Sequence, residues 1–123
     1  MPIYISLNVD VDLIHRILGH MHIDHAGGLD AFAHRKDVEI WVHDKELKSA
    51  LWSVATGADI GVYMSHYMNL DWNWKTFDDR TIDFCQGITL HHLPGHTDGI
   101  TYSWHIITHP SADEHYQALL DCR

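Results

Sequence analysis

Three histidines and an aspartate fall within six residues, in the order His-x-His-x-Asp-His from His20 to His25. Imidazole nitrogens and carboxylate oxygens are the ligands that suit zinc and related divalent ions. Because side chains two positions apart on an extended backbone point the same way, His20 and His22 can reach one ion together. Asp24 shares their parity, whereas His25 projects from the other side. A sharp turn after Asp24 would let both face a second ion, and Gly27-Gly28 offers the backbone freedom for that turn.

A later segment, residues 93–99 (LPGHTDG), adds His96 directly after a proline and a glycine. The chain holds 13 histidines among 123 residues, so a histidine-rich loop without a ligand is the alternative interpretation. Four ligand-type residues in this order, before a double glycine, favour a metal site over that alternative. An aromatic-rich patch lies between the two segments, and we interpret it as core packing, with an acyl pocket as the alternative: Tyr63, His66, Tyr67 and Met68.

The two segments together resemble the metallo-β-lactamase superfamily, whose signature is His-x-His-x-Asp-His followed at a distance by Pro-Gly-His. The run from His20 to Leu29 (HMHIDHAGGL) is most similar to the N-acyl-homoserine lactonases, and residues 45–50 (KELKSA) resemble a helix start in that branch. The resemblance implies an α/β fold, as part of a metallo-β-lactamase-like αββα sandwich. Residues 1–123 are expected to form one partial domain of this kind.

The resemblance also implies which residues hold the first metal ion. In the family, the first two histidines of the signature and the histidine of the later segment bind one ion, which here are His20, His22 and His96. Three neutral imidazoles leave an open position for water, as catalytic zinc requires.

For the second ion, the resemblance implies Asp24 and His25 as ligands, with a carboxylate bridging both ions. Asp121 is the candidate for the bridge, and an ordinary surface aspartate is the alternative. The family's last histidine ligand and a lactonase tyrosine would fall beyond Arg123, and its first strands are not seen. The sequence is therefore expected to be a fragment of the family domain, holding two Zn²⁺ as in the family or one.

The expected activity is that of a dinuclear-zinc hydrolase which opens the lactone ring of N-acyl-homoserine lactones, a quorum-quenching reaction. A hydroxide activated by the metals would attack the ring carbonyl, and Asp24 could relay the proton to the leaving oxygen. The substrate partner is then a small lactone. Other hydrolases of the superfamily remain open, namely a glyoxalase II-like thioesterase or a β-lactamase. A truncated metal-binding remnant without catalysis is the third interpretation.

Composition narrows the class of protein. The formal net charge of −9 argues against nucleic acid, because phosphate binding needs a basic face. No window is long and apolar enough for a membrane span. Two cysteines, Cys85 and Cys122, make no zinc-finger spacing or disulfide framework, and residues 1–12 lack signal-peptide features. We therefore expect a cytoplasmic location, while the oligomeric state stays open.

These residues must be positioned by strands and helices that hydrophobic periodicity predicts. The expected strands are 3–7, 13–18, 38–42, 81–84, 88–92, 100–107 and 115–120. The expected helices are 29–34, 45–55 and 63–70. Asp44 is the expected cap of helix 45–55, and its inward face is expected to be formed by Leu47, Ala50, Leu51 and Val54.

Overall fold

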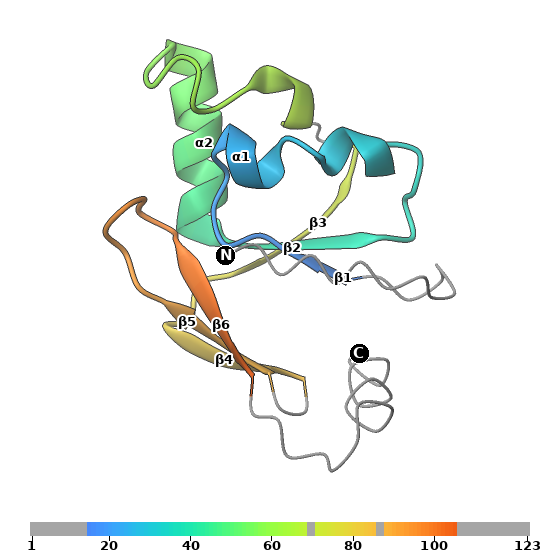
Figure 1. Ribbon diagram of the computed structural model, residues 1–123, viewed down its shortest axis with the longest axis vertical. Coiled ribbons are helices and arrows are strands. Elements are labelled where there is room, and N and C mark those ends of the chain that lie inside the picture. The colour runs from blue at the N-terminus through green and yellow to red at the C-terminus, as the bar shows by residue number, and fades with distance from the viewer. Residues whose placement is uncertain (1–14, 69–70, 86–87, 106–123) are drawn as a thin grey trace.

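The computed structural model describes residues 15–68, 71–85 and 88–105 of the chain, which form two small sheets and the helices around them (Figure 1). The first sheet is parallel, in the order β1-β2-β3, and comprises β1 (His15–Ile17), β2 (Glu39–His43) and β3 (Asn73–Phe77). The second is antiparallel, in the order β4-β5-β6, and comprises β4 (Thr81–Cys85), β5 (Ile88–His92) and β6 (Thr101–His105).

Four helical segments accompany the sheets. The long helix α2 spans Asp44–Thr56, and the single turn α1 spans Ile23–Ala26. Two 3₁₀ turns, η2 and η3, cover Leu29–Phe32 and Ser65–Tyr67. None of these helices, within the described part of the chain, has the length and apolar character needed to cross a bilayer.

Strand β2 is buried on both faces, and this sets the layers of the fold. Ile40 and Val42 belong to a core shared with α1, α2 and η3, whereas Trp41 packs into a second core against the antiparallel sheet. Successive side chains of a strand point to opposite faces, so one strand serves both cores. The order is helices, parallel sheet, antiparallel sheet, which confirms the α/β fold expected as part of an αββα sandwich.

The N-terminus of α2 is capped by His43, where the sequence analysis expected Asp44. The His43 ring nitrogen Nδ1 accepts a hydrogen bond from the backbone N–H of Lys45 at 3.2 Å. His43 is fully buried and its ring stacks on His92 with 3.8 Å between centroids. Asp44 lies one position inside the helix and forms an ion pair with Lys48. The expectation failed because histidine is not a usual capping residue, and its capping nitrogen is held by tertiary packing.

The buried face of α2 also differs from the expected one. Its buried residues are Glu46, Ala50 and Ser53, whereas Leu51 is 37% exposed. Leu47 and Val54 pack at the margin of the core. The buried face of α2 is therefore rotated from the predicted apolar face so that it includes Glu46 and Ser53. Hydrophobic periodicity alone would place these two polar residues on the solvent side.

The other differences are local. Strand β3 was not expected, and the expected helix 63–70 is reduced to η3. Ala33, which directly follows η2, is exposed. The expected strands 3–7 and 115–120 lie outside the described residues.

Helix α2 begins in close contact with the connection between β5 and β6. A Cβ atom added to Gly99 would lie 2.1 Å from the backbone nitrogen of Glu46 and 2.3 Å from its Cβ. Such distances are shorter than van der Waals contact, and backbone atoms cannot move aside as a flexible side chain can. Only glycine therefore fits at position 99.

Two glycines of the same connection give a matched test of this packing. Gly99→Ala is expected to lower the free energy of unfolding by about 3 kcal/mol or more, since it forces α2 away from the connection. An added Cβ at Gly95 would have no atom of the described residues within 4 Å, and Gly95 has no positive φ, so Gly95→Ala should stay within about 1 kcal/mol of the unchanged chain. Urea unfolding measures both, and equal stabilities of the two variants would contradict the packing described.

The buried cap gives a pH test. Burial, followed by repulsion from His92, lowers the pKa of His43 from its ordinary value of 6.5. The unfolded chain therefore binds this proton more readily than the folded chain, and stability falls as the pH drops below about 6.5. His43→Asn keeps a capping acceptor without the titrating ring. Its unfolding free energy, measured with a chelator present, should fall less steeply between about pH 7 and 5. Parallel pH curves for the two chains would refute this assignment.

Candidate metal centre

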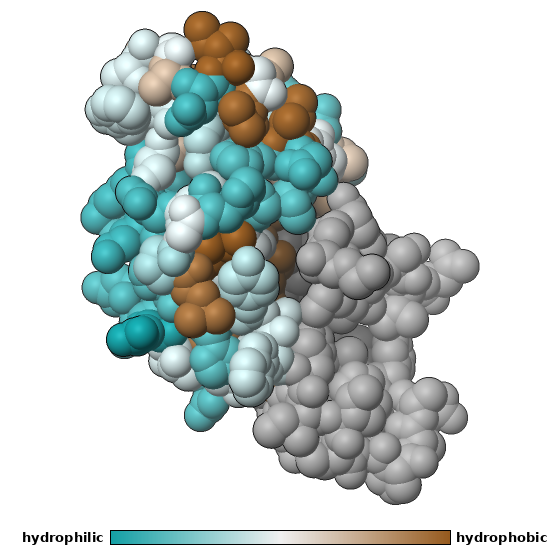
Figure 2. All heavy atoms as spheres, turned by 60° about the vertical axis from the view of Figure 1, so that its left-hand side comes forward, coloured by the Kyte–Doolittle hydropathy of each residue, from teal (hydrophilic) through white to brown (hydrophobic). Residues whose placement is uncertain are grey.

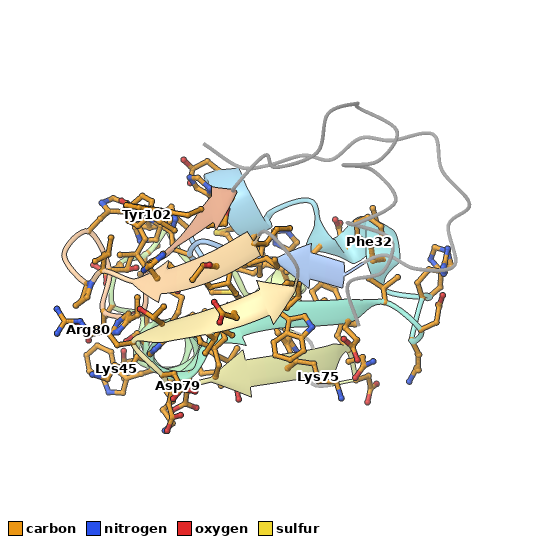
Figure 3. All side chains as sticks on the ribbon, turned by 90° about the horizontal axis from the view of Figure 1, so that it is seen from below. Phe32, Lys45, Lys75, Asp79, Arg80 and Tyr102 are labelled. Atoms are coloured by element: carbon orange, nitrogen blue, oxygen red, sulfur yellow. The ribbon has the colours of Figure 1, made fainter. Side chains whose placement is uncertain are left out.

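The histidines are delivered to one edge of the structure by two connections. The parallel strands β1, β2 and β3 all end toward the side on which Lys45 and Asp79 lie (Figure 3). His20 and His22 follow β1 at this edge, and His96 lies in the connection from β5 to β6. Sites of open α/β sheets form beyond the carboxyl ends of parallel strands, as here.

The three rings lie close together although His96 is far from the others in the sequence. One ring nitrogen from each of His20, His22 and His96 lies within 4.8 Å of the others, so that together they could hold a metal ion. The ring centroids are 4.8 Å apart for His20 and His22, and each lies 4.9 Å from that of His96. His20 is buried and His96 is exposed, so the group is open to solvent on one side.

A second group shares His20 with the first. Ligand atoms of His20, Asp24 and His25 also lie within 4.8 Å of one another. The Asp24 carboxylate is exposed, with Oδ2 at 3.5 Å from Nε2 of His25. Asp121, the expected bridging residue, lies outside the described residues.

The chain reverses earlier than the sequence analysis expected. The turn was placed after Asp24, but α1 already begins at Ile23, and its helical backbone carries Asp24 and His25 to the same side as His20. Gly27 and Gly28 have φ values of −60° and −89°, so neither uses the left-handed conformation that glycine permits. The helical turn, and not a glycine turn, brings the second group together.

Burial and the neighbouring histidines keep the rings of His20 and His22 neutral. Burial, followed by repulsion from His25 and His22, lowers the pKa of His20 from 6.5 to about 4. Burial and then His96 lower the pKa of His22 as well. The buried Nε2 of His20 has no hydrogen-bond partner within the part of the chain that the structure describes. Because a neutral imidazole nitrogen without a partner is a free electron-pair donor, these residues fit a divalent cation.

Both backbone groups of Met21, the residue between His20 and His22, are hydrogen-bonded to buried side chains. Its N–H donates to Oε1 of Glu46 at 2.8 Å, and its carbonyl accepts from Oη of Tyr67 at 2.8 Å. Sequence reasoning assigned Tyr67 to core packing and gave Glu46 no role. A carboxylate on the inward face of an amphipathic helix was the signal that could have identified Glu46.

Two hydrogen bonds hold the connection from β5 to β6, which carries His96 (the second histidine loop), near the connection from β1 to α1, which carries His20 and His22 (the first histidine loop). The backbone N–H of Thr101 donates to the carbonyl of Gly19 at 2.8 Å, and the N–H of Gly99 donates to Oε2 of Glu46 at 3.1 Å. His92 donates from Nε2 to the carbonyl of Asp98 at 2.7 Å, which fixes the same connection internally. One backbone–backbone hydrogen bond and one bond to the Glu46 carboxylate therefore hold the segment that carries His96 near the segment that carries His20.

A cavity of about 730 Å³ opens beside the histidine group. Its apolar lining comes from Trp52, Val62 and Tyr63, and His22 and His96 also line it. Figure 2 shows this side of the molecule, where apolar residues gather at the top, over the end of α2 and the following loop. The polar wall is formed by Lys48, Ser49, Ser53, Asp59, Thr97 and Asp98.

Tyr63 carries a phenol beside this group. The ring centroids of Tyr63 and His22 are 4.8 Å apart. Burial, and next the negative charge of Glu46, raise the pKa of Tyr63 to about 12. The phenol therefore stays protonated at neutral pH and keeps its capacity to donate a hydrogen bond.

The chain is similar to solved structures of lactone hydrolases. A solved N-acyl homoserine lactone hydrolase, with the product N-hexanoyl-L-homoserine bound at its catalytic metal centre, is 29% identical, with a TM-score of 0.60. An AiiA variant from B. thuringiensis, with N-decanoyl-L-homoserine at its active site, gives the same identity and TM-score. Each match covers 75% of this chain and 32% of the other, so this chain spans about a third of their length.

A more distant likeness supports the fold alone. A probable metal-dependent hydrolase from Staphylococcus aureus is 22% identical with a TM-score of 0.60, over 72% of this chain and 32% of that one. No curated protein matches the sequence significantly.

The family itself is decided by a model of its sequence pattern. The model described as the metallo-beta-lactamase superfamily matches residues 11–107. This range holds both histidine segments and every strand that the structure describes. The chain belongs to the metallo-β-lactamase superfamily.

Proposed function

We propose that this chain binds zinc through His20, His22 and His96 and contributes the metal site of a hydrolase that opens N-acyl-homoserine lactones. The observation that carries the proposal is the convergence of three imidazoles, one of them with a buried Nε2 that has no hydrogen-bond partner among the residues the structure describes. Membership of the superfamily supports hydrolysis as the reaction class. The likeness to solved lactone hydrolases supports lactones as the substrate class.

Asp24 and His25 are proposed as ligands of a second ion, beside the first. Their ligand atoms share one neighbourhood with His20, which supports this assignment. Asp121 is proposed as the bridge from its sequence context alone. A chain that holds only the first ion would be mononuclear.

A divalent ion at the first group would lower the pKa of water and polarise a carbonyl, which is the chemistry that lactone hydrolysis needs. The chain's own residues would supply the rest. The Asp24 carboxylate is exposed beside His25 and can carry a proton toward the leaving oxygen. The apolar wall of Trp52, Val62 and Tyr63 would hold the substrate's acyl group next to the histidines.

Metal binding is tested by thermal unfolding. Zinc at about 100 times its dissociation constant adds about 2.7 kcal/mol to the free energy of unfolding, so Tm should rise by several degrees, and a chelator should reverse the rise. His96→Ala should remove most of this rise. His34→Ala is the matched control, since His34 is an exposed histidine outside the group, and the rise should persist in it. A rise of the same size in both variants would contradict the proposed ligand set.

The substrate class is tested with three compounds offered to the zinc-loaded chain. Hydrolysis of N-acyl-homoserine lactones, without hydrolysis of a glutathione thioester or a chromogenic β-lactam, is the expected result. Asp24→Asn, compared at equal zinc content because Asp24 is also a proposed ligand, should then lower kcat by about 100-fold or more, as expected for loss of a proton carrier. Preference for the thioester or the β-lactam would assign the chain to another activity of the superfamily. Zinc uptake without any hydrolysis would mark a metal-binding remnant.

A further inference from the structure

We infer that Glu46 is a positioning residue, whose carboxylate holds the two histidine loops in the arrangement that a metal ion needs. The inference rests on the metal binding proposed above. Glu46 lies in the first turn of α2 and is fully buried. It reaches Met21 and Gly99, which are 25 and 53 positions away in the sequence.

The two carboxylate oxygens serve different loops. Oε1 accepts from the N–H of Met21, the residue between His20 and His22, at 2.8 Å. Oε2 accepts from the N–H of Gly99, three residues after His96, at 3.1 Å. A carboxylate is rigid and planar, so its two acceptors fix the distance between the two backbone segments. The separation of the ligands on the two loops then depends on this side chain as well as on the hydrogen bond from Thr101 to Gly19.

Packing alone does not account for a carboxylate at this position. A buried carboxylate is costly unless hydrogen bonds replace its hydration, and an apolar side chain would fill the same volume without that cost. Both oxygens of Glu46 are committed to the ligand loops. The close approach at Gly99, where no Cβ fits, brings the second N–H within reach.

Loss of Glu46 should let the distance between the two histidine loops vary more widely, while other hydrogen bonds still keep the loops together. The bond from Thr101 to Gly19 still joins the loops, and Tyr67 still holds the carbonyl of Met21. The free chain would therefore sample wider separations of His96 from the other two histidines, and binding would have to order them. Removal of groups that orient metal ligands typically lowers metal affinity by about 10- to 100-fold.

Cobalt titration of the full chain tests this inference, because Co²⁺ absorbs visible light according to the number and geometry of its ligands. Glu46→Ala should weaken Co²⁺ binding by about 10- to 100-fold and broaden or weaken its visible bands. Val38→Ala is the control for general destabilisation. Val38 is 1% exposed and precedes β2 at the end opposite α2, so Co²⁺ affinity should stay within about twofold of the unchanged chain.

The outcomes separate the positioning role from simple stability and from the proposed function. Equal Co²⁺ affinity of the unchanged chain and a folded Glu46→Ala variant would overturn the inference. An equal loss in Val38→Ala would overturn it too, since any destabilisation would then suffice. If circular dichroism shows that Glu46→Ala does not fold, Glu46→Gln decides. Its amide keeps one acceptor and releases one loop, so undiminished affinity would overturn the inference. Failure of the unchanged chain to take up Co²⁺ would overturn both this inference and the proposed metal site.

Discussion

A single buried carboxylate, that of Glu46, joins three segments that lie far apart in the sequence. It sits where α2 begins, and it accepts backbone hydrogen bonds from Met21 and Gly99. A carboxylate leaves water at considerable cost, so the arrangement is stable only with both donors in place. Hydrogen bonds are directional, whereas apolar packing is not. The helix and the two histidine loops are therefore fixed in orientation as well as in contact.

The electrostatics of the histidine group follow from burial more than from the charge of the chain. A formal net charge of −9 would favour protonated histidines, yet the pKa of His20 lies at about 4. Burial is the largest cause, the neighbouring rings act in the same direction, and attraction to Asp24 is the smallest influence. Asp24 is exposed, so water screens its charge. Burial thus keeps the rings of His20 and His22 neutral in an acidic chain, which favours a cation over a proton at these two residues.

The sequence predicted the parts that depend on local spacing. The alternation of Val38, Ile40 and Val42 located β2, and the two His-containing segments identified the rings that the structure brings together. It could not predict features whose partners are distant. Glu46 faces inward only because Met21 and Gly99 supply donors, and His43 caps α2 only because tertiary packing buries its ring. Strand β3 was missed because its burial does not alternate, and among the described strands it lies at the edge of its sheet. The metal roles of these residues remain predictions.

The convergence of the two loops on one cation is most directly tested by X-ray diffraction from crystals of the zinc-loaded chain at the zinc absorption edge. We expect an anomalous peak at about 2.0–2.1 Å from ring nitrogens of His20, His22 and His96 together. A peak bound to only one of the two loops, or no peak between these three rings, would contradict it.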